Sequence, residues 1–221
     1  MIRILSTKTL LPNQKQFLLN AGFSVIEANF IQTQNLPFDC SPIRDNLIFT
    51  SQNAVSSVLQ TGDIDSLKHK ACFCVGNKTK SSLEQHGFKV VETADYAIDL
   101  AQIIISSYKY QSFTFFSGNL RQDVLPDMLG NEKIDYNEIE VYKTVLIPNK
   151  IDTFIDGILF FSPSGVESYL NNNSITSQIC FCIGTTTAKA LADKTNNVIL
   201  ANQPSVENVI IQTIKYFKEQ P

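Results

Sequence analysis

The chain of 221 residues has no tryptophan, two histidines and only 18% charged residues. His69 and His86 stand beside charged or polar residues and in no triad or metal-ligand spacing. We therefore expect both at the surface, and no histidine-based catalysis or metal site. The formal charge of -3 provides no general attraction for nucleic acid or an anionic membrane surface. Any anionic ligand must be held by local groups.

Long apolar runs and a secretory leader are also missing. No run approaches the roughly 20 apolar residues of a membrane span. The stretch Met1–Ser6 reads as a strand, without the charged leader and cleavage site of a signal peptide. Four of the five cysteines sit inside apolar runs. We therefore expect a cytoplasmic protein with reduced thiols, and 43% hydrophobic residues suffice for a packed core.

An internal duplication is the most informative feature of what the chain does contain. The string LIFTSQNAVSSVL at 47–59 resembles ILFFSPSGVESYL at 158–170, and CFCVGNKTKSSL at 72–83 resembles CFCIGTTTAKAL at 180–191. Each string joins a short apolar run, a small polar turn and a segment with helical spacing, which is typical of a strand–helix unit in a parallel sheet. Four further units of this kind start near residues 3, 90, 113 and 198. The chain thus predicts two α/β domains of four units each.

Two extended stretches, 28–38 and 138–148, are bounded by Pro37 and Pro148. We interpret them as a two-stranded bridge, through which the chain leaves the first domain and returns to it. Domain 1 is then discontinuous, with residues 1–30 and 149–221. The linker strands are 31–40 and 139–148, and the inserted domain 2 is 41–138.

The turns between strands and helices carry the polar residues that could bind a ligand. They are 50–53, 75–79, 117–121, 162–165 and 183–187. In an open α/β sheet such turns lie at the carboxyl ends of the strands, where helix N–H groups attract carboxylate or phosphate. Each turn alone is better explained as an ordinary helix cap, worth about 1 kcal/mol. Five similar turns in two domains favour a cleft for a large polyanion.

Seven strings resemble, in the same order, the motifs of uroporphyrinogen-III synthases. They are FTSQNAV, FCVGNKTKSSL, SGNLRQDVLPDML, EVYKT, FFSPSGV, CIGTTTAKAL and ANQPSVENVIIQTIKYF. They cover nearly the whole chain, weakly before residue 45. The resemblance implies an α/β fold with two Rossmann-like or flavodoxin-like parallel-sheet domains joined by a two-stranded β-ladder, domain 1 being discontinuous.

The same resemblance implies a cofactor-independent lyase of tetrapyrrole biosynthesis. It implies that hydroxymethylbilane, held between the domains, is cyclised to uroporphyrinogen III with inversion of ring D and loss of water. No metal, nucleic acid or membrane is expected as a partner. We expect a monomer, and a transient contact with hydroxymethylbilane synthase is left open.

Particular residues follow from the resemblance. Tyr142 matches the tyrosine that the family places facing the cleft, and its phenol could donate a hydrogen bond to the departing hydroxyl. Without the resemblance, Tyr142 reads as a strand tyrosine that packs one face. Seven residues match turn positions expected to bind the substrate: Ser51, Thr79, Asn119, Arg121, Ser164, Thr186 and Thr187.

Arg121 is the cation expected to hold a carboxylate, because its planar fork can bind one bidentately. The alternative is a solvated residue in the first turn of a helix, where a cation is unfavourably placed. Lys78 and Thr185 occupy turn positions that vary in the family, so no contact is assigned to them.

Two cysteine pairs, Cys72 with Cys74 and Cys180 with Cys182, could indicate a four-thiolate zinc site. Equivalent places in separate domains keep the pairs apart, so we expect all four to pack in cores as small apolar groups. A nucleotide-dependent transferase would need a glycine-rich phosphate loop, which the sequence lacks. The competing interpretation is a non-catalytic bilobed α/β protein that binds a small polyanionic ligand.

Overall fold

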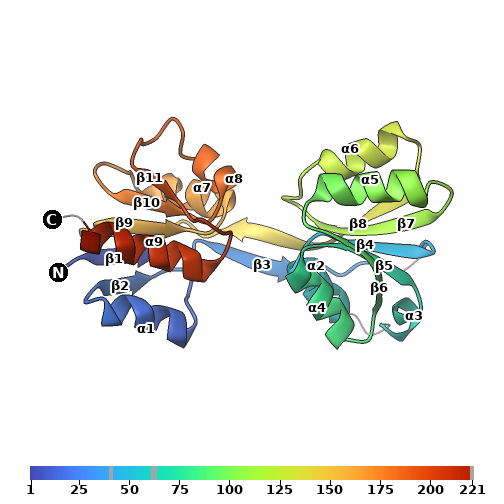
Figure 1. Cartoon of the computed structure of the whole chain (residues 1–221), viewed down its shortest axis with the longest axis horizontal. Helices are drawn as coiled ribbons and strands as arrows, with labels where there is room; N and C mark the ends of the chain where they lie inside the picture. Colours follow the sequence, from blue (N-terminus) through green and yellow to red (C-terminus); the bar gives the residue numbers. More distant parts are fainter. Residues whose placement is uncertain (40–41, 61–63, 220–221) are drawn as a thin grey trace. The chain divides into compact units, whose positions relative to one another are not determined.

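The computed structural model describes residues 1–39, 42–60 and 64–219. The chain divides into two compact units, unit 1 with Met1–Gln32 and Val145–Pro221, and unit 2 with Thr33–Thr144. Each unit is a sheet with helices on both faces (Figure 1). The predicted boundary between the first linker strand and domain 2, at residues 40 and 41, lies outside the described residues.

Unit 1 is a five-stranded sheet in the order β11-β10-β9-β1-β2. Its strands are β1 (Arg3–Ser6), β2 (Ser24–Glu27), β9 (Gly157–Phe160), β10 (Ile179–Cys182) and β11 (Val198–Leu200). Every pairing between them is parallel. Numbered along the chain within the unit, the strands follow the order 2-1-3-4-5, which is that of flavodoxin-like sheets.

Helices cover both faces of this sheet. On one face α1 (Pro12–Asn20) and α9 (Val206–Glu219) pack over Ile4, Leu159 and Phe181. On the other face α7 (Pro163–Asn172) and α8 (Thr185–Lys189) pack over Ile158 and Phe160. A strand buried on both sides needs consecutive apolar residues, which explains the runs GILF and ICFC.

Unit 2 is a six-stranded sheet in the order β3-β8-β7-β4-β5-β6. Its strands are β3 (Ile31–Asn35), β4 (Asn46–Phe49), β5 (Ala71–Val75), β6 (Lys89–Ala94), β7 (Ser112–Gly118) and β8 (Asp135–Leu146). Numbered from β4 along the chain, the five strands from β6 to β8 follow the order 3-2-1-4-5 of Rossmann sheets. The helices α2 (Gln52–Leu59) and α4 (Asn77–Gln85) cover one face, and α5 (Ala97–Ser107) and α6 (Val124–Asn131) cover the other. The short α3 is Asp65–Lys68.

The extended stretches on either side of unit 2 form β3 and β8. The N–H of Leu36 donates to the carbonyl of Val141 (2.9 Å), and that of Ile147 donates to the carbonyl of Phe30 (2.8 Å). As the residue number rises along the first stretch, the number of its hydrogen-bond partner in the second stretch falls. The two strands are therefore antiparallel. Both strands cross the chain positions where one unit ends and the other begins.

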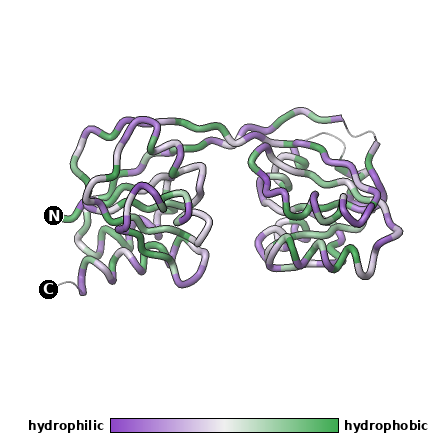
Figure 2. Tube along the Cα trace, turned by 90° about the horizontal axis from the view of Figure 1, so that it is seen from above, coloured by the Kyte–Doolittle hydropathy of each residue, from purple (hydrophilic) through white to green (hydrophobic). Residues whose placement is uncertain are grey.

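The predicted fold class is confirmed: the chain is α/β, with two sheets that are mainly parallel. The duplicated strings form equivalent pieces, β4–α2 with β9–α7 and β5–α4 with β10–α8. Along the helices hydrophobic and hydrophilic positions alternate, as the amphipathic spacing predicts (Figure 2). Within the described ranges, none of the helices has the length and apolar character that a membrane crossing requires.

All four cysteines of the two pairs are buried in the cores, as predicted. Burial raises the pKa of Cys72, and likewise that of Cys180, to about 12. These thiols are therefore protonated and unreactive at neutral pH, since the thiolate is the nucleophile and the metal ligand.

Candidate active site

The topology of unit 2 places a ligand site at the carboxyl ends of β4 and β7. These strands are neighbours, but the helices that follow them, α2 and α6, cover opposite faces of the sheet. Where the direction of winding reverses in this way, the loops diverge and leave a crevice. The crevice is determined by the strand order and needs no particular residue.

A pocket of about 340 Å³ occupies this position. Its lining comes from β5, β7 and β8, from the loops after β4, β6 and β7, and from the first turns of α5 and α6. The lining residues are Thr50, Ser51, Val75, Asp95, Tyr96, Ala97, Phe115, Leu120, Arg121, Gln122, Leu125 and Tyr142. Three of the residues predicted from the sequence, Ser51, Arg121 and Tyr142, thus meet in one pocket. The pocket combines apolar side chains with polar and charged groups, both of which a small-molecule site needs.

Tyr142 is seated by a glycine on the neighbouring strand. The register of β7 against β8 shifts between Ser117 and Gly118, so that Gly118 comes to lie beside Tyr142. A Cβ atom built on Gly118 would lie 2.2 Å from Cζ of Tyr142 and 2.5 Å from Cε2. The phenol ring therefore lies directly on the glycine backbone. No side chain could occupy position 118 without displacing the ring.

The hydroxyl of Tyr142 has no hydrogen-bond partner among the residues that the structure describes. Its ring packs at the edge of a core cluster, while the residue also lines the pocket. Tyr142 therefore packs against the core with its ring, as the sequence alone suggested, and also lines the pocket. The arrangement holds the ring and leaves the O–H group available as a donor.

Arg121 is paired within the protein. Its Nε and Nη2 atoms donate to the two carboxylate oxygens of Glu138, with Nη2 at 3.0 Å from Oε2, and Nη1 donates to Asp123. The hydrogen bonds to Glu138, and secondarily those to Asp123, raise the pKa of Arg121. The fork that was expected to hold a ligand carboxylate thus holds Glu138 in this structure. Sequence reasoning overlooked that pairing because Arg121 lies in the loop after β7, whereas Glu138 lies on β8, 17 residues further along the chain.

Ser51 and Thr79 stand at the starts of helices in unit 2. Ser51 is the N-cap of α2, and its hydroxyl accepts the N–H of Asn53 at 3.1 Å. Thr79 lies in the first turn of α4 and is only 4% exposed. The N-cap of this helix is Gly76, whose φ of +84° favours glycine. The Thr79 side chain is thus part of the core boundary, whereas Ser51 faces the pocket.

Asn119 fastens the loop after β7 to β8. Its Oδ1 accepts the N–H of Thr144 at 2.8 Å, and its Nδ2 donates to the carbonyl of Thr144 at 3.2 Å. Both amide atoms are thereby engaged with backbone. The structure gives Asn119 a positioning role beside Tyr142, whose own carbonyl accepts the Asn119 N–H at 3.4 Å.

The three remaining predicted residues lie in unit 1. Ser164 is in the first turn of α7, where its hydroxyl lies 3.1 Å from that of Ser162, the N-cap. Thr186 is exposed in the first turn of α8, whereas Thr187 is 1% exposed. These turns stand at the carboxyl edge of the unit 1 sheet, as expected.

Several pocket residues escaped the sequence reasoning. Asp95 and Tyr96 follow β6 in a turn that carries no cap or glycine pattern. Leu120 lies in the predicted turn after β7, but no role was assigned to it. In unit 1, Lys8 lies two residues after the end of β1, and its Nζ lies 4.9 Å from the ring centroid of Phe161. A lysine just after the first strand is a sequence signal that could have marked Lys8 as a candidate for binding a carboxylate.

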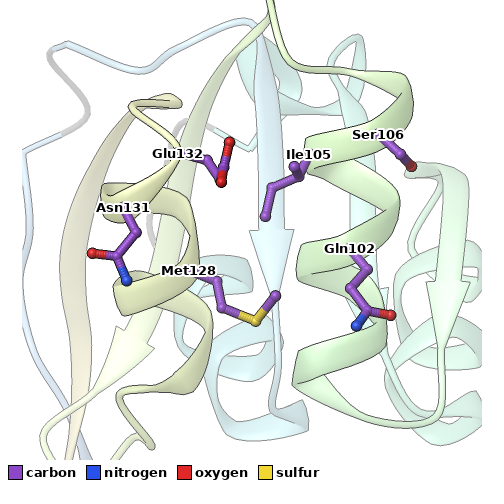
Figure 3. A pocket seen from close by; sticks show the side chains of 6 residues that line it. All are labelled: Gln102, Ile105, Ser106, Met128, Asn131 and Glu132. Carbon is purple, nitrogen blue, oxygen red and sulfur yellow. The ribbon is translucent and has the colours of Figure 1, made fainter.

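A second hollow, of about 500 Å³, lies between α5 and α6 (Figure 3). Ile105 and Met128 point into it, and its charged residue, Glu132, pairs with Lys109 at 3.1 Å. It is formed by the C-terminal halves of the two helices, and so lies toward the amino ends of the strands. That edge of an α/β sheet seldom carries the ligand site.

Two sheets of mainly parallel strands with helices on both faces, and a pocket at the switch point of unit 2, define a two-domain α/β protein with a candidate ligand site. The chain matches the family described as uroporphyrinogen-III synthase HemD over residues 14–211, and it belongs to this family. These proteins are cyclising lyases of tetrapyrrole biosynthesis. The predicted family is thereby confirmed, and the non-catalytic binding protein is not favoured.

Relatives and solved structures agree with this assignment. A uroporphyrinogen-III synthase of Chlorobaculum parvum is 27% identical over 192 residues, which are 76% of this chain and 77% of that protein. The crystal structure of uroporphyrinogen-III synthetase from Helicobacter pylori has a TM-score of 0.78, with 19% identity over 98% of this chain and 100% of that one. A mutant uroporphyrinogen III synthase from Thermus thermophilus has a TM-score of 0.69, with 13% identity and both chains fully covered. At these identities the two structures speak for the fold alone.

Proposed function

We propose that this protein is itself a uroporphyrinogen-III synthase, which cyclises hydroxymethylbilane to uroporphyrinogen III with inversion of ring D and loss of water. The observation that carries the proposal is the Tyr142 hydroxyl. It belongs to a side chain that lines the switch-point pocket, and it has no partner within the described part of the chain. Family membership supplies the substrate class.

The chemistry requires control of orientation more than strong acids or bases. The lone pair of a pyrrole nitrogen helps to expel the terminal hydroxyl, and the resulting azafulvene is reactive. Ring D must then be attacked at its substituted α-carbon, so that a spiro intermediate forms, fragments and recloses with ring D reversed. Without an enzyme, the linear tetrapyrrole closes to the uninverted type I macrocycle. Fixed geometry is the effect that selects one of two such closures.

Tyr142 assists the first step in this proposal. Its O–H donates a hydrogen bond to the departing hydroxyl, directly or through one water, while the C–O bond breaks. A phenol is a hydrogen-bond donor and a weak acid, so it stabilises the leaving group as the bond breaks rather than protonating it beforehand. Gly118 and Asn119 hold the ring and the adjoining loop in place for this task.

The carboxylates of the substrate are proposed to bind at the carboxyl edges of the two sheets. Ser51, Ser164 and Thr186 supply hydroxyls there, and helices α2, α4 and α7 supply N–H groups at their first turns. Thr79 and Thr187 contribute through their backbone, because their side chains are buried. Arg121 and Asn119 shape the loop after β7, and Arg121 could also exchange Glu138 for a substrate carboxylate.

Four wider expectations accompany the proposal. The buried, protonated thiols fit a reducing compartment such as the cytoplasm. We infer a monomer that needs no cofactor for this reaction. A transient contact with hydroxymethylbilane synthase stays a prediction.

The proposal is tested by isomer analysis of the product. Purified protein is given hydroxymethylbilane without added metal or nucleotide, the product is oxidised, and the type I and type III porphyrins are separated chromatographically. A synthase yields mainly type III. A non-catalytic binding protein leaves only the spontaneous type I product, and that outcome in well-folded protein would refute the proposal.

A further inference from the structure

Two exposed apolar side chains stand at the pocket of unit 2. Tyr96 is 69% exposed and Leu120 is 56% exposed, and both line the pocket that contains Tyr142. Scattered apolar side chains are normal on protein surfaces, but apolar residues gathered at one pocket mark a binding site. They come from separate loops, Tyr96 after β6 and Leu120 after β7. The tertiary fold is therefore what brings both residues to the same pocket.

The position of Tyr96 is unusual for the start of a helix. Tyr96 is the N-cap of α5, with extended backbone and no side-chain hydrogen bond to the helix. Serine, threonine, aspartate and asparagine are preferred at this position because their oxygen atoms accept an N–H of the first turn. Tyrosine supplies no such acceptor, and its hydroxyl has no partner among the described residues. Residues that break a local rule without a structural gain are often kept for function.

We propose that Tyr96 and Leu120 form an apolar platform for the pyrrole rings of the substrate, an inference that rests on the proposed function. Hydroxymethylbilane is a polyanion only at its side arms, and its four rings present flat apolar faces. The polar groups at the carboxyl edges of the sheets can bind the carboxylate side chains of the substrate. They leave the flat faces of the pyrrole rings exposed to water. A phenol ring and a leucine side chain at the mouth of the pocket cover one face and keep that pyrrole beside Tyr142.

The platform determines which closure takes place. A pyrrole ring that can tumble in the pocket presents either α-carbon, whereas a ring held against Tyr96 and Leu120 presents one. Removing the platform therefore weakens binding and lets more substrate escape to spontaneous closure. The share of type I product should rise together with the Michaelis constant, while turnover falls less.

Tyr96→Ala is the decisive variant, and Tyr96→Phe is its matched partner because it keeps the ring. We expect Tyr96→Ala to raise KM about tenfold, the size of one aromatic contact, and to increase the type I fraction. Tyr96→Phe should stay within about twofold of the parent, since the ring and not the hydroxyl makes the contact. Leu120→Ala should act in the same direction as Tyr96→Ala. Tyr110→Ala is the control, because Tyr110 is 99% exposed and lies beyond the other end of α5.

The outcomes separate the platform from the activity itself. A parent protein that makes only the type I macrocycle would refute the proposed function. A parent that makes type III while Tyr96→Ala and Leu120→Ala match it in KM and isomer ratio would refute the platform alone. Equal losses in Tyr96→Phe and Tyr96→Ala would assign the effect to the hydroxyl and would also overturn the platform. Circular dichroism and melting temperature confirm that each variant is folded.

Discussion

At the scale of single residues, the contact of Gly118 with Tyr142 is the most sharply determined feature of the site. The ring occupies the space that any Cβ at position 118 would need. The bulge in β7 and β8 brings the two residues side by side. Bulges are common next to active sites because they redirect a side chain. Gly118 is thus a positioning residue for the Tyr142 hydroxyl.

The first prediction concerns that hydroxyl. Tyr142→Phe should fold with the stability of the parent, because the ring and its packing are kept and no hydrogen bond is lost. Turnover should fall by about a hundredfold, as expected for loss of a group that assists proton transfer. Steady-state kinetics with hydroxymethylbilane measure it, and full activity would remove Tyr142 from the mechanism.

The second prediction concerns the seat of the ring. Gly118→Ala should lower stability by about 1–3 kcal/mol, the usual cost of overpacking, and reduce turnover at least about tenfold. In a Tyr142→Phe background the same change should reduce turnover much less, because the hydroxyl it displaces is already gone. Gly130→Ala, where nothing lies within 4 Å of the added Cβ, is the control. Equal losses in both backgrounds would contradict a positioning role.

The third prediction concerns the pair of Arg121 and Glu138. If the substrate competes with Glu138 for the guanidinium fork, Glu138→Gln should lower KM, and Arg121→Gln should raise it more than it lowers turnover. Arg44→Gln is the control, since Arg44 pairs with Asp135 at 3.1 Å near the start of β8. A KM that rises in Glu138→Gln would show that the pair is only a brace for the loop.

At the scale of elements, Glu27 joins the end of β2 to the start of α1. Its carboxylate accepts the N–H of Leu10 at 2.8 Å and pairs with Lys15, and its side chain is 15% exposed. Burial alone would raise the pKa of Glu27, but the hydrogen bonds from Lys15 and Leu10 hold it below its usual value. The junction before α1 therefore depends on an ionised carboxylate.

A pH dependence of stability follows as the fourth prediction. A carboxylate whose pKa is lower in the folded state contributes stability above its unfolded pKa, near 4.5, and loses it as pH falls through the folded value. Glu27→Gln should therefore unfold at lower urea than the parent at pH 7, with the difference shrinking below pH about 4.5. Glu84→Gln, whose exposed partner Lys80 is 3.9 Å away, is the control. A difference independent of pH would contradict the ionic contribution.

At the scale of the whole molecule, the two units have separate hydrophobic cores. The clusters under α2 and α4 and under α5 and α6 consist of unit 2 residues alone. Those under α7 and α8 and under α1 and α9 consist of unit 1 residues alone. The chain nevertheless enters unit 1 at its start and completes it only after unit 2, so unit 1 is closed by contacts between distant segments, such as β1 with β9.

Separate cores predict separable unfolding, which is the fifth prediction. Phe160→Ala, in the core of unit 1, should destabilise one unfolding transition by about 3–5 kcal/mol and leave the other nearly unchanged. Phe116→Ala should do the same to the core of unit 2. Urea titration and calorimetry measure both transitions. One cooperative transition that both variants shift equally would contradict independent cores.

Much of the fold was already determined by local patterns in the chain. Apolar runs followed by polar turns and helical spacing specify strand–helix units because burial on both faces of a sheet demands those residues wherever the unit lies. The duplication of LIFTSQNAV and ILFFSPSGV indicated two such sheets. Parallel pairing directs the strand–helix turns to one edge of each sheet, which is why a ligand site could be expected at the polar turns. Ser51, Arg121 and Tyr142 were assigned to the site by the family resemblance. The cysteine pairs were assigned to cores because they occupy equivalent places in two separate domains.

Only the tertiary structure decided which residues meet. The strand order places β4 beside β7 and so creates the pocket, and the shift in register sets Tyr142 on Gly118. The pairing of Arg121 with Glu138, and the place of Tyr96 and Leu120 in one pocket, involve segments that no local pattern connects. Periodicity reports the face on which a side chain lies. It carries no information on the partner across the sheet, because that partner is set by the path of the whole chain.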